Sequence, residues 1–210
     1  MAMARAPIVA LMASTQRGLL AATAWRDEEL VARALRGEVL AEEVLFRRHA
    51  PSLLAVALRL LGRRSEAEDA VQDTFVLALE RLDQLRDPSA LRAWLRCIVV
   101  SQARRRLRRA RMLRSLGIAR APGDDEVSLE SLASNDASPD THAQLAQIDR
   151  VLRRLPVDER LAWTLRRVEG WQLADVASAC DCSLATAKRR IAVADRAVGA
   201  TSVISPEESP

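Results

Sequence analysis

An acidic stretch near residue 70 is the first part of this sequence whose side chains could do chemistry. In SEAEDAVQDTF (65–75), Ser65 and Glu68 have the spacing of a capping box, which predicts a helix start. Apolar residues then recur at helical spacing, at Ala67, Ala70, Val71, Phe75, Ala78, Leu79 and Leu82. The other face carries Glu66, Asp69, Gln72 and Asp73. Such a face can bind a basic partner, although most acidic helix faces are merely solvated.

A run of arginines, RRRLRRARMLR (104–114), is the strongest electrostatic feature. Six arginines fall within eight residues, at Arg104, Arg105, Arg106, Arg108, Arg109 and Arg111. Positive charge is favourable at the C-terminal end of a helix, but six cations exceed what that effect needs. We therefore expect contacts with nucleic-acid phosphates, and a solvated helix end is the alternative.

The stretch LADVASACDCSLATAKRRIAVADRAV (173–198) has the pattern of a helix-turn-helix. It predicts a short helix over 173–179, a turn over 180–182 and a longer helix capped by Ser183. The expected core residues are Val176, Ala177, Leu184, Ala187, Ile191 and Ala194. The outward face then carries Ala185, Thr186, Lys188, Arg189 and Arg196, which suits the major groove and its phosphates. An ordinary helical hairpin with a basic face is the alternative.

Composition favours an all-α protein. The 210 residues are 49% hydrophobic but only 3% aromatic, with seven glycines and few stretches that alternate with period two. Basic residues are almost all Arg, Lys188 being the single lysine, and the isoelectric point near 9.7 permits a polyanionic partner. Cys97, Cys180 and Cys182 do not form a disulfide framework, which suits a reducing cytoplasm. The sequence has no apolar run long enough to span a membrane.

The charge distribution predicts two helical domains joined by a flexible acidic linker. Residues 25–114 carry a net charge of +6, residues 115–141 of −5, and residues 142–199 of +3. The middle segment is rich in Ser, Pro, Gly and Asp without a sustained period, as linkers are. Residues 1–24 are expected to be a disordered extension or the product of a start codon placed too early, rather than a signal peptide. Residues 200–210 are expected to be a disordered tail.

Periodicity and breakers predict the helices of each domain. In the first domain they cover 27–36, capped by Asp27 and ended by Gly37; 39–61, with a bend at Pro51 and an end at Gly62; and 65–85. A fourth begins at Asp87-Pro88 and buries Leu91, Trp94, Leu95, Ile98 and Val99 before it enters the arginine run. In the second domain, helices over 142–154 and 158–168 precede the helix-turn-helix. The first of these buries Leu145, Ile148, Leu152 and Leu155 and ends at Pro156.

These motifs together resemble the extracytoplasmic-function sigma factors, over residues 26–199. RLLGRRSEAEDAVQDTFVLALERL (59–82) is similar to the core of region two, and LRAWLRCIVVSQARRRLRR (91–109) to the helix that follows it. LRRLP (152–156) and LRRVEGWQLADVASACDCSLATAKRRI (165–191) are similar to region four. The order of the three fragments and the linker also match the family.

The resemblance implies a bacterial transcription initiation factor, which is not an enzyme and needs no cofactor. It implies a cytoplasmic protein whose partners are core RNA polymerase, promoter DNA and an anti-sigma factor. The clamp helices of the largest polymerase subunit would bind Asp69, Gln72 and Asp73, with Glu66 and Glu68 nearby. The flap of the second-largest subunit would be a further contact. An acidic linker of this family could imitate RNA in the polymerase cleft or act as a tether, and composition fits both.

The resemblance also implies two DNA-binding sets. The minus-ten element would contact Arg92, Arg96, Ser101, Arg104, Arg105, Arg108 and Arg109. The minus-35 element would contact Ser183, Thr186, Lys188, Arg189 and Arg190. Val100 and Ser101 stand where relatives often have Arg and Asn, so a promoter sequence cannot be transferred from relatives.

Two other classes of protein compete with this interpretation. A plain helix-turn-helix regulator would bind duplex DNA without polymerase, but it leaves the acidic helix and the LRAWL segment unexplained. An enzyme has little support, because His49 and His142 are isolated and no nucleophile triad or phosphate loop is visible. Cys180 and Cys182 could bind a metal or sense oxidants, yet zinc spacing is missing, so we expect a turn cysteine packed in the core.

Overall fold

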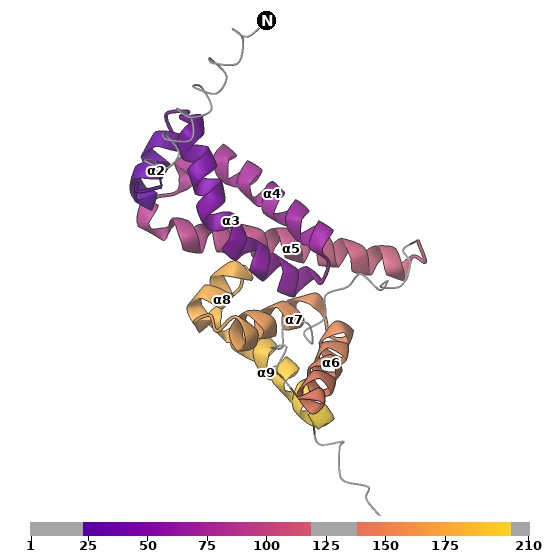
Figure 1. The fold of residues 1–210 in the computed structure, drawn as a ribbon. Coiled ribbons are helices and arrows are strands. Elements are labelled where there is room, and N and C mark those ends of the chain that lie inside the picture. Colours follow the sequence, from indigo (N-terminus) through magenta and orange to yellow (C-terminus); the bar gives the residue numbers. More distant parts are fainter. Residues whose placement is uncertain (1–22, 119–137, 203–210) are drawn as a thin grey trace, which may run out of the picture.

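The computed structural model describes residues 23–118 and 138–202, and in those two stretches it contains helices and turns but no strand (Figure 1). The all-α prediction is therefore confirmed. The first group of helices comprises α2 (Asp27–Ala34), α3 (Val39–Leu61), α4 (Arg64–Glu80) and α5 (Leu91–Ser115). The 3-10 turns η1 (Leu82–Gln84) and η2 (Pro88–Ala90) connect α4 to α5. Most of the predicted acidic linker lies outside the described residues.

The second group comprises α6 (Pro139–Arg154), α7 (Val157–Trp163), α8 (Leu173–Ala179) and α9 (Leu184–Ser202). A π-helical turn, η4 (Thr164–Val168), continues α7. α6 begins three residues earlier than expected, because the hydroxyl of Ser138 accepts a hydrogen bond from the backbone N–H of Thr141 and caps the helix there. Pro156 follows its end, as predicted.

Of the three helix-start caps expected in the first group, the one at Asp87 is correct and those at Asp27 and Ser65 are wrong. α3 has the expected bounds, contains Pro51, and ends at Gly62 in the left-handed region, with φ of 78°. The carboxylate of Asp87 accepts from the N–H of Ser89, as expected of a cap. The capping box at Ser65 is wrong, because α4 already begins at Arg64 without a side-chain cap.

Asp27 is likewise not a cap. It lies in the first turn of α2, where its carboxylate instead forms an ion pair with Arg48, 2.7 Å away. α4 also ends at Glu80 instead of 85, since the chain tightens into η1, and Leu79 is 38% exposed rather than buried. At Asp27 a tertiary contact thus replaces the expected local cap.

The helix-turn-helix forms as predicted in its main features. The hydroxyl of Ser183 accepts a hydrogen bond from the N–H of Thr186, which confirms the cap of α9. The turn needs Asp181 at a positive φ of 49°, a conformation that aspartate tolerates. Val176, Ala177, Ala187, Ile191 and Ala194 are buried. Leu184 is 52% exposed, so its expected place in the core is wrong; as the first residue of α9 it faces solvent.

The two groups of helices are packed against each other. α5 contacts both α7 and α8, and one apolar cluster extends from Leu30 and Leu53 through Val99 to Leu165 and Val176. A smaller cluster of Leu152, Trp163 and Ala194 joins α6 to α9. In Figure 1 the second group lies beneath the middle of α5, and the end of α5 extends beyond it.

Candidate nucleic-acid and protein interface

The acidic face of α4 is solvent-exposed, as its spacing predicts. Asp69, Gln72 and Asp73 are exposed. Glu68 pairs with Arg64 at 2.8 Å, and Asp73 pairs with Arg106 of α5. Asp69 has no ion pair with any residue in the described ranges. The face therefore has one carboxylate, Asp69, that is available to a basic partner without breaking an internal contact.

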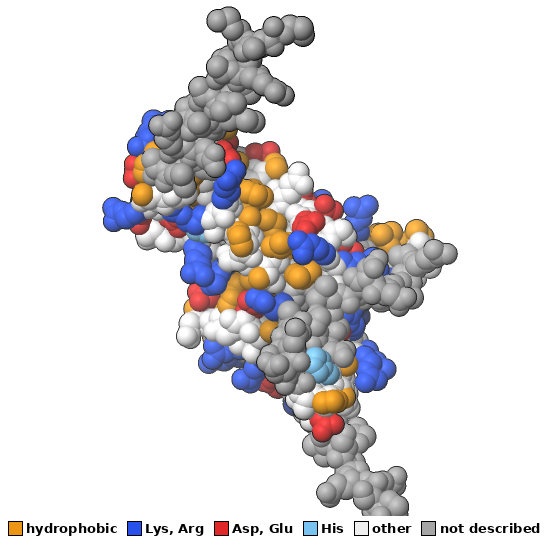
Figure 2. All heavy atoms as spheres, viewed as in Figure 1, with side chains coloured by type: hydrophobic (Ala, Val, Ile, Leu, Met, Phe, Trp, Pro, Cys, Tyr) orange, Lys and Arg blue, Asp and Glu red, His pale blue; other side chains and the backbone are white. Residues whose placement is uncertain are grey.

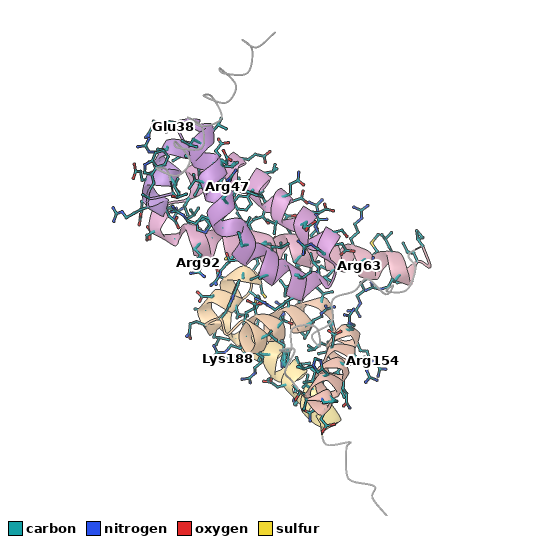
Figure 3. The ribbon with its side chains drawn as sticks, in the orientation of Figure 1. Glu38, Arg47, Arg63, Arg92, Arg154 and Lys188 are labelled. Carbon is teal, nitrogen blue, oxygen red and sulfur yellow. The ribbon has the colours of Figure 1, made fainter. Side chains whose placement is uncertain are left out.

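An apolar groove runs along this acidic face, between α3 and α4. Its volume is about 680 Å³, and its floor is formed by Phe46, Ala50, Leu54 and Val71. Glu68 and Gln72 form its edge on α4, and Arg47 lies on the α3 side (Figure 3). The ring of Phe46 is 45% exposed although it packs on Phe75, with 4.8 Å between ring centroids. Figure 2 shows hydrophobic side chains gathered over α3 and α4.

Sequence reasoning missed this groove. The spacing of four residues between Phe46, Ala50 and Leu54 in α3 marks a second apolar stripe beside the buried one, and it could have indicated an unfilled face. The combination of apolar floor and acidic edge is typical of a surface that receives an amphipathic helix with basic flanks.

The arginine run divides into two sets. Arg105 and Arg109 are exposed, lie one helical turn apart and form no ion pair with the residues the structure describes. Arg104 donates to the backbone carbonyl of Cys180 at 2.6 Å, and Arg108 donates to Asp158 at 2.7 Å. Of these four arginines, only Arg105 and Arg109 are free of contacts with the second group while the two groups are packed together.

The other predicted minus-ten residues lie toward the start of α5. Ser101 and Arg92 are exposed, and Figure 3 shows Arg92 where α5 approaches α8. The guanidinium of Arg96 lies 4.9 Å from the ring centroid of Trp171, on the second group. Its burial, together with the positive charge of Arg92, lowers the pKa of Arg96.

The predicted minus-35 residues mostly share one face of α9. Lys188 and Arg189 are exposed, and Thr186 is half-buried beside the Ser183 cap. Figure 3 shows Lys188 on the second group. Arg190 donates to Asp158 at 3.0 Å, and its side chain is only 18% exposed. It is therefore held inside the molecule in this arrangement.

Charged contacts join the two groups. Asp158 of α7 accepts from Arg108 of the first group and Arg190 of the second. The carboxylate of Glu169, 7% exposed, forms a two-pronged ion pair with Arg59 of α3, with 3.0 Å between Nη2 and Oε2. Two predicted DNA contacts, Arg108 and Arg190, thus share one internal carboxylate.

The three cysteines are free thiols, and the structure explains why Cys180 should react slowly. Cys180 is buried, and that burial raises the pKa of its thiol to about 12. Within residues 23–118 and 138–202 no three His, Cys, Asp or Glu side chains are grouped so that they could hold a metal ion. No helix in the same ranges is long and apolar enough to cross a membrane.

Comparisons with known proteins show which family the chain belongs to. Residues 45–112 match the family model for sigma-70 region 2, and residues 145–194 match that for sigma-70 region 4. The chain is 35% identical over 167 residues to the ECF RNA polymerase sigma factor SigM of Mycobacterium tuberculosis, covering 79% of each chain. It is 29% identical over 185 residues to the RNA polymerase sigma-H factor of Pseudomonas aeruginosa, covering 82% of this chain and 92% of that one.

Two solved structures are also similar. One is the sigma factor RpoE in complex with the anti-sigma factor NepR from Bartonella quintana, with a TM-score of 0.57 and 26% identity. That match covers 78% of this chain and 98% of RpoE. The other is CnrH in complex with the cytosolic domain of CnrY, with a TM-score of 0.55 and 26% identity over 85% of this chain and 99% of CnrH.

Proposed function

Because the chain belongs to the extracytoplasmic-function group of the sigma-70 family, we propose that its two groups of helices divide the contacts with RNA polymerase and promoter between them. The protein is a transcription initiation factor that directs RNA polymerase to promoters, and it acts by binding rather than by catalysing a reaction. The proposal concerns which residues make each contact.

Core polymerase docks on α3 and α4. The observation that supports this assignment is the apolar groove of Phe46, Ala50 and Leu54 beside the acidic edge of α4. A basic amphipathic helix of the largest subunit would bury its apolar side in the groove and place cations beside Asp69, Gln72 and Asp73, with Glu66 and Glu68 in support. Asp73 would have to leave Arg106 before it could pair with a cation of the polymerase. Asp69, which has no such contact to break, therefore contributes most to docking.

The minus-ten element lies along α5. Arg105 and Arg109 contact phosphates first, because no described residue neutralises them. Arg92, Arg96 and Ser101 lie nearer the start of α5, and Arg96 becomes available to the promoter once it leaves Trp171 of the second group. Arg104 and Arg108 join only when the two groups of helices separate and their contacts to Cys180 and Asp158 break.

The minus-35 element binds α9. A capped helix start with Ser183 and Thr186, followed by exposed Lys188 and Arg189, fits the major groove of duplex DNA. Arg190 reaches the phosphate backbone once Asp158 releases it. The flap of the second-largest polymerase subunit would hold this group at the upstream element.

We further assign an inhibitory partner and a compartment. The similar RpoE was solved with an anti-sigma factor, and we propose that an anti-sigma factor also binds this chain. The protein acts in the cytoplasm, where polymerase and chromosome are found.

Transcription in vitro with core polymerase and a genomic promoter library tests the proposal. Asp69→Arg should reduce core binding and transcription strongly, since removing one partner of a charge pair at an interface costs about 2–5 kcal/mol. Asp83→Arg is the matched control: it makes the same charge change at an exposed residue in η1, outside the face. Unchanged polymerase affinity of Asp69→Arg would remove this surface from the mechanism.

Footprinting separates the proposal from a plain helix-turn-helix regulator. We expect protection of the promoter only with core polymerase, together with unpaired bases at the minus-ten element. Tight protection of duplex DNA by the free protein would favour the regulator instead.

A further inference from the structure

A pocket of about 300 Å³ lies where the first group of helices meets the second, apart from the groove on α3 and α4. One wall comes from η2 and α5, with Ser89, Arg92 and Arg96, and the other comes from the second group, with Trp171, Asp175 and Ser178. Its volume is at the lower end of the range found for small-molecule sites. Figure 3 shows Arg92 at this junction of α5 and α8.

The pocket wall includes a hydrogen-bond donor without an acceptor. Trp171 is only 5% exposed, and its indole Nε1 is buried with no hydrogen-bond partner within the described ranges. Buried N–H groups nearly always have an acceptor, because their lost hydration is otherwise uncompensated. The junction of the two groups therefore leaves the indole N–H of Trp171 unsatisfied.

The charges around the pocket favour an anion as its ligand. Arg92 and Arg96 line it from one side, and neither forms an ion pair within residues 23–118 and 138–202. Arg96 stacks on Trp171, so its guanidinium is held in place. Asp175 is the single carboxylate in the wall, while Glu169 nearby is already paired with Arg59. The wall thus keeps an excess of positive charge, and Ser89 and Ser178 add hydroxyl donors.

We infer that this pocket binds a small oxyanion of the phosphate class and that the bound ion joins the two groups of helices. Its oxygens accept from Arg92 and Arg96 on the first group and from the hydroxyl of Ser178 on the second. A planar guanidinium fork suits phosphate oxygens in particular. Because its ligands come from both groups, the ion is bound only while they are packed together. By linkage it stabilises that packed arrangement.

NMR on the full-length free protein tests this inference. Inorganic phosphate is titrated at constant ionic strength against chloride, and the indole N–H resonance of Trp171, assigned with Trp171→Phe, is followed. We expect a saturable shift with phosphate but not with chloride. Arg96→Gln should weaken phosphate binding by about tenfold or more, as the loss of a charged hydrogen bond predicts. Arg92→Gln, at the exposed rim, gives a second variant that keeps the fold.

Arg111→Gln is the matched control, because Arg111 is exposed on α5 outside the pocket, and it should bind phosphate as the unchanged protein does. A response that is equal for phosphate and chloride would mean that the pocket does not select a phosphate-class ion, and would overturn the inference. So would phosphate affinity that survives both Arg92→Gln and Arg96→Gln. The last titration uses a short single-stranded oligonucleotide. A response to the oligonucleotide but not to inorganic phosphate would overturn the inference, because the pocket would then be part of the DNA-binding surface. Since polymerase is absent throughout, failure here leaves the proposed promoter function untouched.

Discussion

Cys180 lies in the turn between α8 and α9, 1% exposed and next to the small alanines that let these helices cross. Burial of its thiol, and then the proximity of Cys182, raise its pKa to about 12. Since the thiolate is the reactive form, iodoacetamide near pH 8 should alkylate Cys180 far more slowly than the half-buried Cys97. Peptide mapping by mass spectrometry over time measures both rates. Equal alkylation rates for Cys180 and Cys97 would show that the turn opens readily. Cys180 would then again be a candidate redox sensor.

His49 is a buried polar residue of α3 that gives stability a dependence on pH. Its side chain is 7% exposed, with Nε2 3.2 Å from a carboxylate oxygen of Asp27. Burial lowers the pKa of His49 and outweighs the favourable Asp27, while Arg48 and Arg92 act in the same direction as burial. Below about pH 6.5 the unfolded chain therefore binds a proton that the folded chain does not. The free energy of unfolding should fall as the pH drops from about 6.5 toward the lowered pKa.

Denaturant unfolding at several pH values between about pH 8 and pH 5 gives the free energy of unfolding at each pH. The slope of this free energy against pH checks the prediction. His49→Gln should flatten it. His142→Gln, on α6, is the matched histidine control and should keep it. If the slope survived in His49→Gln, another group would be responsible for the pH dependence.

At the scale of elements, α5 combines two roles along one helix. Arg105 and Arg109 are exposed, while Arg104 and Arg108 hold the second group. Changing Arg105 and Arg109 to Gln should weaken promoter binding by the holoenzyme about equally for all sequences, because phosphate contacts carry no base identity. The slope of log affinity against log salt should fall by roughly one unit for each phosphate contact that is removed.

The control for this prediction changes the net charge equally on another helix. Arg150 and Arg154 of α6 are exposed and also one turn apart, so their Gln double variant should leave the salt slope nearly unchanged. Equal slopes for both double variants would identify the arginine run as a solvated helix end.

At the scale of the whole molecule, packing of the two groups hides residues that promoter binding needs. Asp158 accepts from Arg108 and Arg190, and its other oxygen has no partner within the described residues. Asp158→Asn removes the countercharge from both arginines. It should weaken the packing by about 1–3 kcal/mol, the cost of removing a charged hydrogen bond. Small-angle scattering of the free variant should then show a larger radius of gyration.

Asp195→Asn provides the comparison within one group. Asp195 accepts from Trp163 at 3.0 Å and pairs with Arg167 at 2.7 Å, all in the second group. The variant Asp195→Asn should lower the melting temperature without changing the radius of gyration. If the radius of gyration of Asp158→Asn did not increase, the apolar contacts and the Arg59–Glu169 pair would be sufficient to hold the groups together.

Features set by neighbours in the chain could be predicted from sequence. Gly62 ends α3, Asp87 and Ser183 cap helix starts, and the buried stripes of α5 and α9 follow their spacing, because each depends on residues within a turn or two. The acidic face of α4 and the Lys188–Arg189 face were predictable for the same reason. The capping box at Ser65 failed where the fold started the helix earlier.

Only the tertiary structure decided which charges remain available to partners. Arg59 meets Glu169 across 110 residues, and Arg108 meets Asp158 across 50. Sequence shows that these side chains are charged, but an ion pair depends on a position in space that no local pattern encodes. The groove on α3 and α4 and the pocket around Trp171 arise in the same way, from helix surfaces whose neighbours are chosen only when the chain folds. Local chemistry thus determined the helices and their faces, and packing determined which faces stayed open.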